Sequence, residues 1–407
     1  MRRLLQVGFR LGAFDPPEVS PYAKIGIDTV RSPEHLKLAE QLSSESMTLL
    51  TNHNYFLPLI KESAHRVAVI GPAGGDDYET GNYFGKPVHK TSVVQGLAAV
   101  LGSDTKVEFE RGTGFVESAE PAAMARAVEL ARKSDVVILC LGTNLQVEAE
   151  GRDRRDLGLP GAQQQLLEAV YAANPKTVLV LMNAGPLAVT WANDHLPAIL
   201  SAWYPGENGG NTIAQTLFGM NNPGGKLPYT VYANLDGVPP QNEYDVSKGF
   251  TYQYFKGNPL YPFGHGLSYT TFAYSHYNVV KTGSGADAKI EISFNLKNDG
   301  TRAGDEVVQL YTHEQSSTVV QPIKTLRAFQ RLRLQPGETK SVSLQVPVKQ
   351  LAFYDVRIHD FRVEPGMYDI WTGSSSDDIR LRSTVTLGIS PRRLSVKPAA
   401  PKPHSQK

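Results

Sequence analysis

The sequence contains a single cysteine, Cys140, so the chain cannot form an internal disulfide bond. Folding therefore does not require an oxidising compartment. Cys140 lies inside an apolar run at residues 136–141, where a buried and unreactive thiol is expected rather than a nucleophile. The cysteine content thus predicts neither disulfide stabilisation nor thiol chemistry.

An excess of charge of either sign is also missing. Forty-one Lys and Arg residues stand against 40 Asp and Glu residues, which gives a formal net charge of +1. No net field draws the chain toward nucleic acid or anionic lipid, so neither nucleic acid nor a membrane is expected as a partner. The balance allows a neutral partner such as a sugar.

Long apolar runs are absent as well, and no stretch is long enough to cross a bilayer. Residues 1–5 are basic and then apolar, as in a signal peptide, but Arg10 and Asp15 interrupt the apolar part. No export signal is predicted within the chain, and its localisation stays open.

Recognisable metal and nucleotide motifs are equally scarce. The ten histidines show no paired metal-ligand spacing, so no metal site is expected, and His265 is not assigned as a ligand. Residues 71–75 follow an apolar run, but their glycine spacing does not fit a dinucleotide fingerprint, and a structural turn is expected. No cofactor is predicted, and a nucleotide-binding function has only fold-level support.

What the sequence does contain, over residues 32–230, is an alternation of short apolar runs and amphipathic segments. The apolar runs lie at residues 67–70, 136–139, 178–181 and 198–200, and the amphipathic segments lie around residues 92–101, 119–133, 161–173 and 209–218. Continuous apolar strands separated by helices predict an α/β sandwich, in which helices cover both faces of a mostly parallel sheet.

The first helix of this domain has a clear start. Ser32 is a good N-cap and Pro33 suits the first helical position. Leu36, Leu42 and Leu49 follow at helical spacing, and this predicts an apolar face directed at a core.

After residue 274 the pattern becomes an alternation of apolar and polar residues, with turn signals between short runs. This predicts an all-β sandwich over residues 275–390 and leaves residues 231–274 as an interdomain connection. Residues 1–31, which carry several prolines, are predicted to be a linker remnant rather than a regular element. Residues 391–407 are rich in proline and basic residues and are predicted to be a disordered tail.

The loop after the second apolar run carries two candidate acids, Glu148 and Glu150. Such loops gather at the carboxyl edge of a parallel sheet, where ligands bind. A carboxyl group there can act as a general acid toward a leaving oxygen, and Arg154 is expected to stabilise Asp153 and fix the loop. The chemistry of these residues alone favours a solvated, charged loop that has no catalytic role.

Long motifs in a fixed order then indicate a family. The segment Val-Glu-Ala-Glu-Gly-Arg-Asp-Arg at residues 147–154, with Leu-Gly-Leu-Pro at 157–160, resembles the acid/base loop of family 3 β-glucosidases and β-xylosidases. Further segments similar to that family lie at residues 81–85, 204–210, 222–228 and 260–269. Residues 298–311 and 334–339 resemble its fibronectin type III-like domain. The resemblance covers nearly the whole chain, from about residue 8 to 390.

This resemblance implies a retaining hydrolase for β-linked glucosides or xylosides, with a β-glycoside or a xylo-oligosaccharide as substrate. Retaining enzymes need two carboxyl groups about 5 Å apart, one a nucleophile and one an acid/base. In the family the acid/base is a Glu on this loop, and the Glu-Gly-Xaa-Asp-Arg pattern assigns the role to Glu150 with Glu148 in reserve. Trp203 and Tyr204, at the end of a predicted strand, either stack on a sugar ring or fill a seam between domains.

The family also carries its nucleophile, an Asp, on an N-terminal (β/α) barrel. The 31 residues before the α/β domain are too few for a barrel of about 250 residues. We therefore expect the isolated chain to be nearly inactive, because no glycosyl-enzyme forms without the opposing carboxylate. A separate barrel chain is an expected partner. The alternative is a non-catalytic remnant that binds carbohydrate or protein.

Overall fold

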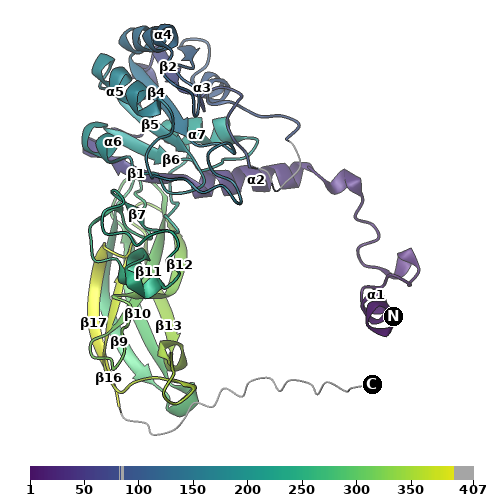
Figure 1. Cartoon of the computed structure of the whole chain (residues 1–407), viewed down its shortest axis with the longest axis vertical. Coiled ribbons are helices and arrows are strands. Elements are labelled where there is room, and N and C mark those ends of the chain that lie inside the picture. The colour runs from purple at the N-terminus through teal and green to yellow at the C-terminus, as the bar shows by residue number, and fades with distance from the viewer. Residues whose placement is uncertain (82, 84–86, 389–407) are drawn as a thin grey trace.

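The computed structural model describes residues 1–81, 83 and 87–388. Within them an α/β domain and a β-sandwich lie end to end, and the N-terminal segment reaches away from both (Figure 1). The predicted disordered tail at residues 391–407 lies outside the described residues, as does part of the motif at 81–85. No helix in the described part of the chain is both long enough and apolar enough to cross a bilayer.

A six-stranded sheet with the order β1-β6-β5-β4-β2-β3 forms the centre of the α/β domain. Its strands are β1 (Thr48–Asn52), β2 (Arg66–Ile70), β3 (Lys106–Glu110), β4 (Val136–Gly142), β5 (Thr177–Met182) and β6 (Ala198–Ser201). All neighbours pair in parallel except β1, which is antiparallel to β6. The expected mostly parallel sheet is therefore confirmed. The prediction missed the two edge strands because they lack a continuous apolar run.

Helices cover both faces of this sheet because successive strand residues point to opposite sides. In β2, Val67 and Val69 belong to one core, and Ala68 and Ile70 belong to the other. The first core is covered by α3 (Val93–Leu101) and α7 (Gly209–Leu217), and the second by α4 (Pro121–Arg132), α5 (Gln163–Ala173) and α6 (Thr190–His195). These helices match the four predicted amphipathic segments, with α6 in addition.

Two glycines let α3 and α7 approach until their backbones touch. A Cβ atom added at Gly96 would lie 2.1 Å from the carbonyl oxygen of Gly210, and one added at Gly210 would lie 2.0 Å from the carbonyl oxygen of Ser92. Ser92 also caps α3, where its hydroxyl accepts from the Gln95 amide and the Gln95 side chain accepts from the Ser92 amide. The start of α3 is therefore fixed both by its cap and by α7.

The N-terminal segment differs from the prediction of a linker without regular elements. Residues Arg2–Arg10 form helix α1, and short 3-10 turns follow at Pro17–Val19 and Ile27–Thr29. The helix forms because good helix formers such as Arg, Leu and Gln dominate there and the prolines begin only at Pro16. The expectation of no element here was wrong.

Helix α2 (Pro33–Ser46) begins as predicted, and the Ser32 hydroxyl accepts from the His35 amide at 3.3 Å. Its predicted apolar face does not close a core. The helix ends at Ser46, Leu49 belongs to β1, and Leu42 is 60% exposed. Instead, α2 contacts α7 through a hydrogen bond of 2.8 Å between the hydroxyls of Ser43 and Thr212.

The second domain is an antiparallel β-sandwich, as expected. One sheet has the order β13-β10-β9 and the other β12-β11-β16-β17. Their strands are β9 (Phe272–Thr282), β10 (Lys289–Asn298), β11 (Gly304–Glu314), β12 (Thr325–Leu334), β13 (Thr339–Pro347), β16 (Gly366–Gly373) and β17 (Ile379–Leu387), and a hairpin of β14 (Phe353–Asp355) and β15 (Asp360–Arg362) lies beside them in the sequence. Alternate residues of β10, from Ile290 to Leu296, are buried between the sheets. The sandwich begins at Phe272, slightly before the expected residue 275.

The connection between the domains is not an extended linker. Strands β7 (Val231–Tyr232) and β8 (Pro259–Tyr261) pair with each other, and the short helix α8 (Thr251–Tyr254) lies between them in the sequence. Tyr261 is buried in the second core of the α/β domain. This segment is therefore packed against the α/β domain rather than spanning a gap.

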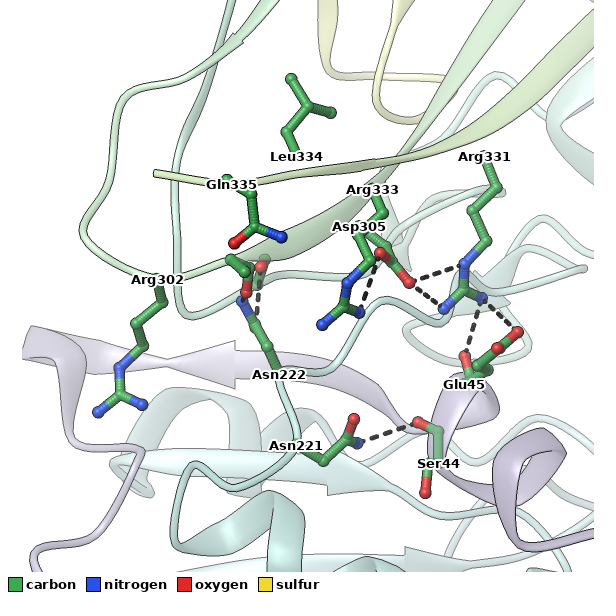
Figure 2. A network of polar contacts seen from close by, with 12 residues as sticks. Ser44, Glu45, Asn221, Asn222, Arg302, Asp305, Arg331, Arg333, Leu334 and Gln335 are labelled. Atoms are coloured by element: carbon green, nitrogen blue, oxygen red, sulfur yellow. Dashed lines mark hydrogen bonds and ion pairs between the residues drawn. The ribbon is translucent and has the colours of Figure 1, made fainter. Parts of the chain in front are cut away.

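Polar contacts hold the β-sandwich against the end of α2 (Figure 2). Asp305 of β11 accepts from the Arg331 guanidinium at 2.6 Å, and the same guanidinium donates to the backbone carbonyl of Glu45 at 3.3 Å. Nearby, the Asn221 amide donates to the carbonyl of Ser44 at 3.0 Å. The Arg331 bond joins the β-sandwich to the last turn of α2, and the Asn221 bond holds that turn within the α/β domain.

A buried ion pair lies at the same junction. The carboxylate of Glu306 accepts from the Tyr274 hydroxyl at 3.0 Å and lies 3.6 Å from the Lys226 ammonium. Burial raises the pKa of Glu306, and the nearby Lys226 opposes this rise. The pair thus links the α/β domain to β11 inside the protein.

The carboxyl group of Glu314, at the end of β11, has a shifted pKa. One of its carboxyl oxygens is buried without a hydrogen-bond partner among the described residues, and burial raises the pKa of Glu314 to about 7. The charged groups around it are Glu364 and Arg362, which form an ion pair with each other. The folded state therefore keeps Glu314 protonated to a higher pH than the unfolded chain does.

Replacing Glu314 by Gln is expected to stabilise the β-sandwich above about pH 7 and to leave its stability unchanged near pH 4. The stability that protonated Glu314 contributes is fully present below its ordinary pKa of 4.5 and is lost as the pH rises through about 7. The pKa difference corresponds to about 3 kcal/mol, and partial exposure reduces the expected gain to about 1–2 kcal/mol. Calorimetric unfolding of both proteins across this pH range measures it, and equal pH profiles would contradict the assignment.

Candidate active site

The loop after β4 lies over a pocket of about 880 Å³ at the carboxyl edge of the sheet. Loops that follow neighbouring parallel strands meet at this edge, so residues distant in sequence share the pocket. Its wall contains Gly81 and Tyr83 after β2, residues of the β4 loop between Leu145 and Leu157 that include Glu148 but not Glu150, Ala184 and Gly185 after β5, Tyr204 after β6, and part of the connection between Leu235 and Phe250. The structure thus brings together the loops that follow four strands of the sheet, β2, β4, β5 and β6.

Both carboxylate oxygens of Glu148 have protein partners. One carboxylate oxygen accepts from the Thr143 hydroxyl at 2.5 Å and from the backbone amides of Ala184 and Gly185 at 2.7 and 3.0 Å. The other oxygen pairs with the Arg154 guanidinium at 3.3 Å. Both side chains of this pair are 13% exposed. A carboxylate with this many donors is held rigidly and connects the β4 loop to the β5 loop.

Arg154 does not stabilise Asp153 as the sequence suggested. It pairs with Glu148 and donates to the backbone carbonyl of Pro186. Asp153 is exposed at the pocket wall. Arg154 therefore does fix the loop, but through Glu148 and the segment after β5.

Glu150 lies at the tip of the same loop, in a tight turn closed by a bridge between Ala149 and Arg152. Gly151 takes a φ of +74° in this turn, a conformation that favours glycine. The exposed Glu150 carboxylate accepts from the hydroxyl of Tyr83 at 2.5 Å. This hydrogen bond raises the pKa of Tyr83. Unlike Glu148, Glu150 has no other hydrogen-bond or ion-pair partner among the described residues.

Two aromatic residues follow β6, and only the second of them, Tyr204, lines the pocket. Trp203 donates its indole N–H to the carbonyl of Ser46 at 2.9 Å and packs edge-on against Tyr229, so it joins β6 to the end of α2. Tyr204 lines the pocket, with its hydroxyl 3.3 Å from that of Thr143. Burial raises the pKa of Tyr204 to about 12, so its hydroxyl stays protonated at neutral pH.

The other sequence candidates have structural surroundings. His265 is stacked on Tyr261, with its Nε2 atom 2.8 Å from the Leu50 carbonyl oxygen. Gly71 takes a φ of +109° and leaves no room for a Cβ atom next to the Cys140 carbonyl, which fits the predicted turn. Cys140 is fully buried, as expected, and burial raises its pKa. The described residues contain no cluster of three or more His, Cys, Asp or Glu arranged to hold a metal ion.

Sequence reasoning missed two parts of the site. Tyr83 lies in a loop that follows a predicted strand, but no role was assigned to it, because its contact with Glu150 depends on the path of a long loop. The wall at residues 235–250 comes from a segment read as a connection, where Gly237, Pro239 and Pro240 were local signals of a defined shape.

Comparison with known proteins decides the family. Residues 47–269 match the glycosyl hydrolase family 3 C-terminal domain, and residues 306–376 match the fibronectin type III-like domain. The chain belongs to glycosyl hydrolase family 3. A β-xylosidase of Formosa agariphila is 34% identical over 402 residues, covering 95% of this chain and 54% of that relative. A periplasmic β-glucosidase of Salmonella typhimurium is 31% identical, covering 93% of this chain and 54% of that relative.

Solved structures agree with this placement in family 3. A β-glucosidase from Erythrobacter marinus superimposes with a TM-score of 0.83 at 34% identity, covering 94% of this chain and 54% of that one. A β-glucosidase from Bifidobacterium adolescentis gives a TM-score of 0.83 at 31% identity, with 93% and 57% covered. The chain spans about half the length of the curated relatives that it matches.

Proposed function

We propose that this family 3 chain supplies the acid/base half of a retaining β-glycosidase that acts on glucosides or xylosides, with Glu150 as the acid/base. The single observation that carries the assignment is the contrast between the two acids of the loop. Both oxygens of Glu148 have protein donors, whereas the exposed carboxylate of Glu150 has one partner among the described residues, Tyr83. A residue that must give and then take a proton needs an unoccupied oxygen.

In the proposed reaction the protonated carboxyl of Glu150 donates its proton to the glycosidic oxygen as the bond from that oxygen to the anomeric carbon breaks. An opposing carboxylate attacks the anomeric carbon and forms a glycosyl-enzyme. The ionised Glu150 then accepts a proton from water as that water displaces the enzyme carboxylate. Glu148 and Arg154 act as positioning residues, because they hold the loop that carries Glu150.

The opposing carboxylate is proposed to come from a barrel domain, supplied by the same polypeptide or by a separate chain. Among the described residues, the acids lining the pocket are Glu148, Asp153 and Asp156, and all three belong to the loop that carries Glu150. A loop does not offer an acid on the far side of a sugar bound against it. The nucleophile therefore has to face the pocket from another element.

Exposed apolar side chains support docking of such a domain. Phe9 of α1 is 66% exposed, Ile27 is 86% exposed, and Leu42 of α2 is 60% exposed. Soluble monomers rarely leave so many large apolar side chains uncovered along one continuous segment. Burial of this segment against a barrel would remove them from water.

The test is hydrolysis of an aryl β-xyloside and an aryl β-glucoside by this chain, with and without a family 3 barrel domain joined or added to it. We expect negligible turnover by the chain alone and enzyme-like turnover with the barrel. Turnover by the chain alone at ordinary glycosidase rates, about 1–10³ s⁻¹, would refute the proposal. Sugar binding without turnover in either case would favour a non-catalytic carbohydrate-binding module.

A further inference from the structure

The side chain of Glu150 has one hydrogen-bond partner among the described residues, and this partner is Tyr83. The Tyr83 hydroxyl donates to the Oε2 atom of Glu150 at 2.5 Å, across a separation of 67 residues in the sequence. Glu150 does not line the pocket, but Tyr83 and Ala149, the residue before Glu150, both do. The hydrogen bond therefore ties the carboxyl group of Glu150 to the rim of the pocket.

This contact limits the rotamers that the Glu150 side chain can adopt. Glu150 is exposed at the tip of a tight turn, and an exposed glutamate samples several rotamers that point its carboxyl group in different directions. Tyr83 is a suitable restraint, because a tyrosine side chain has few rotatable bonds and carries its hydroxyl at the end of a rigid ring. The hydrogen bond selects the rotamers of Glu150 that keep its carboxyl group beside the pocket.

The same hydrogen bond distinguishes the two oxygens of Glu150. A protonated carboxyl group carries its proton on one oxygen and accepts hydrogen bonds on the other. Because Oε2 accepts from the Tyr83 hydroxyl, the proton of the acid form resides on Oε1, which has no hydrogen-bond partner among the described residues. Oε1 is then the atom that gives a proton to a leaving oxygen and later takes one from water.

Glu79 joins the loop that carries Tyr83 to the β4 loop. Its Oε1 atom accepts from the backbone amides of Thr80 and Gly81, both at 2.9 Å, and its Oε2 atom accepts from the backbone amide of Leu145 at 3.3 Å. Gly81 takes a φ of +96°, which glycine adopts without strain. One half-buried carboxylate thus fixes the turn before Tyr83 and connects it to the start of the β4 loop.

We propose that Tyr83 is a positioning residue for the acid/base: it holds the carboxyl group of Glu150 at the rim of the pocket and keeps the donated proton on Oε1. Glu79 supports this role by fixing the loop that carries Tyr83. The proposal rests on the proposed function, because it requires Glu150 to be the acid/base. Tyr83 acts through Glu150 and not on the reacting atoms.

The first test measures the contact in this chain alone. The difference between the ultraviolet titrations of the unchanged chain and of Tyr83→Phe isolates the phenol of Tyr83. Donation to the Glu150 carboxylate raises the pKa of Tyr83 above its ordinary value of 10, so this titration should move to lower pH in a Glu150→Gln background. It should change little in Glu148→Gln, the matched control on the same loop. A Tyr83 titration that is identical with and without the Glu150 carboxylate would overturn the proposal.

The second test uses the full chain joined to a barrel domain. Tyr83→Phe should lower kcat/KM for a methyl glycoside about tenfold, because the acid then spends most of its time in other rotamers. It should change kcat/KM for a dinitrophenyl glycoside far less, since that leaving group departs without a proton. Glu79→Gln keeps an acceptor for the amides of Thr80 and Gly81 but loses the bond from Leu145, so the same leaving-group dependence is expected with a smaller loss, about threefold.

A double-mutant cycle separates positioning from general damage to the fold. In a Glu150→Gln background, Tyr83→Phe should cause no further loss of kcat/KM for the methyl glycoside, because no proton is left to position. An equal loss in both backgrounds, or an equal loss for both leaving groups, would overturn the proposal while the role of Glu150 stands. Unchanged kcat/KM in Glu150→Gln itself would instead refute the proposed function, and the role of Tyr83 with it.

Discussion

Replacing Glu150 by Gln is expected to lower the turnover of aryl β-glycosides by about 10²–10⁴-fold in a protein that also contains the barrel domain. Glutamine keeps the size of the side chain and can still contact Tyr83, but it has no proton to donate to the leaving oxygen. The deficit should grow as the leaving group becomes more basic. Steady-state rates with a dinitrophenyl glycoside and with a methyl glycoside measure this dependence.

External azide offers an independent check of the same role. Azide attacks a glycosyl-enzyme without help from a base, so it should restore turnover of the dinitrophenyl substrate by a Glu150→Ala variant and release a glycosyl azide. A variant that lacks only a structural contact gains nothing from azide. The absence of rescue would argue against Glu150 as the acid/base.

Glu148→Gln is the matched comparison on the same loop. A glutamine oxygen can still accept from Thr143 and from the amides of Ala184 and Gly185, while the ion pair with Arg154 is lost. We expect a rate loss of about tenfold or less, with no dependence on the leaving group, because the loop loosens while the acid remains. A larger loss in Glu148→Gln than in Glu150→Gln, with azide rescue, would reverse the two assignments.

Gly96→Ala is expected to destabilise the α/β domain by about 3 kcal/mol or more. The new Cβ atom would meet the carbonyl oxygen of Gly210 at 2.1 Å, and that carbonyl belongs to the backbone of α7. No side-chain rotation relieves such a clash. Helices α3 and α7 would have to separate, and this would open the core that contains Leu97 and Ile213.

Chemical unfolding followed by circular dichroism measures this loss. Gly366→Ala is the control, since a Cβ atom at Gly366 meets no atom of the described residues within 4 Å. We expect the control to change stability by less than about 0.5 kcal/mol. Equal stability of Gly96→Ala and the control would show that the helices have room to move apart.

The fold class could be predicted well because burial has a direct signature in the sequence. The runs that became β2, β4, β5 and β6 are apolar throughout, as strands covered on both faces must be. Edge strands carry a weaker signature. In β3, Lys106 and Glu108 alternate with Val107 and Phe109, and β1 follows α2 without a turn signal.

Around helix α2, by contrast, the apolar pattern predicted the packing wrongly. Leu36, Leu42 and Leu49 have helical spacing, yet the chain leaves the helix at Ser46 and Leu49 pairs in a sheet. Spacing alone does not reveal whether an apolar face finds a partner within the same chain. Leu42 remains exposed because none of the described elements covers it.

Local sequence determined the residue types available for catalysis: two glutamates on one loop, next to arginines, at the end of a buried strand. It did not determine which glutamate has its carboxylate oxygens occupied by protein donors, because those donors lie far away along the chain. Glu148 is occupied only because folding places Thr143, Arg154 and the amides after β5 around it, and Tyr83 reaches Glu150 from a loop that follows β2. Strand propensity and apolar pattern act between near neighbours, whereas hydrogen-bond saturation of a carboxylate requires donors that only the packed sheet brings together.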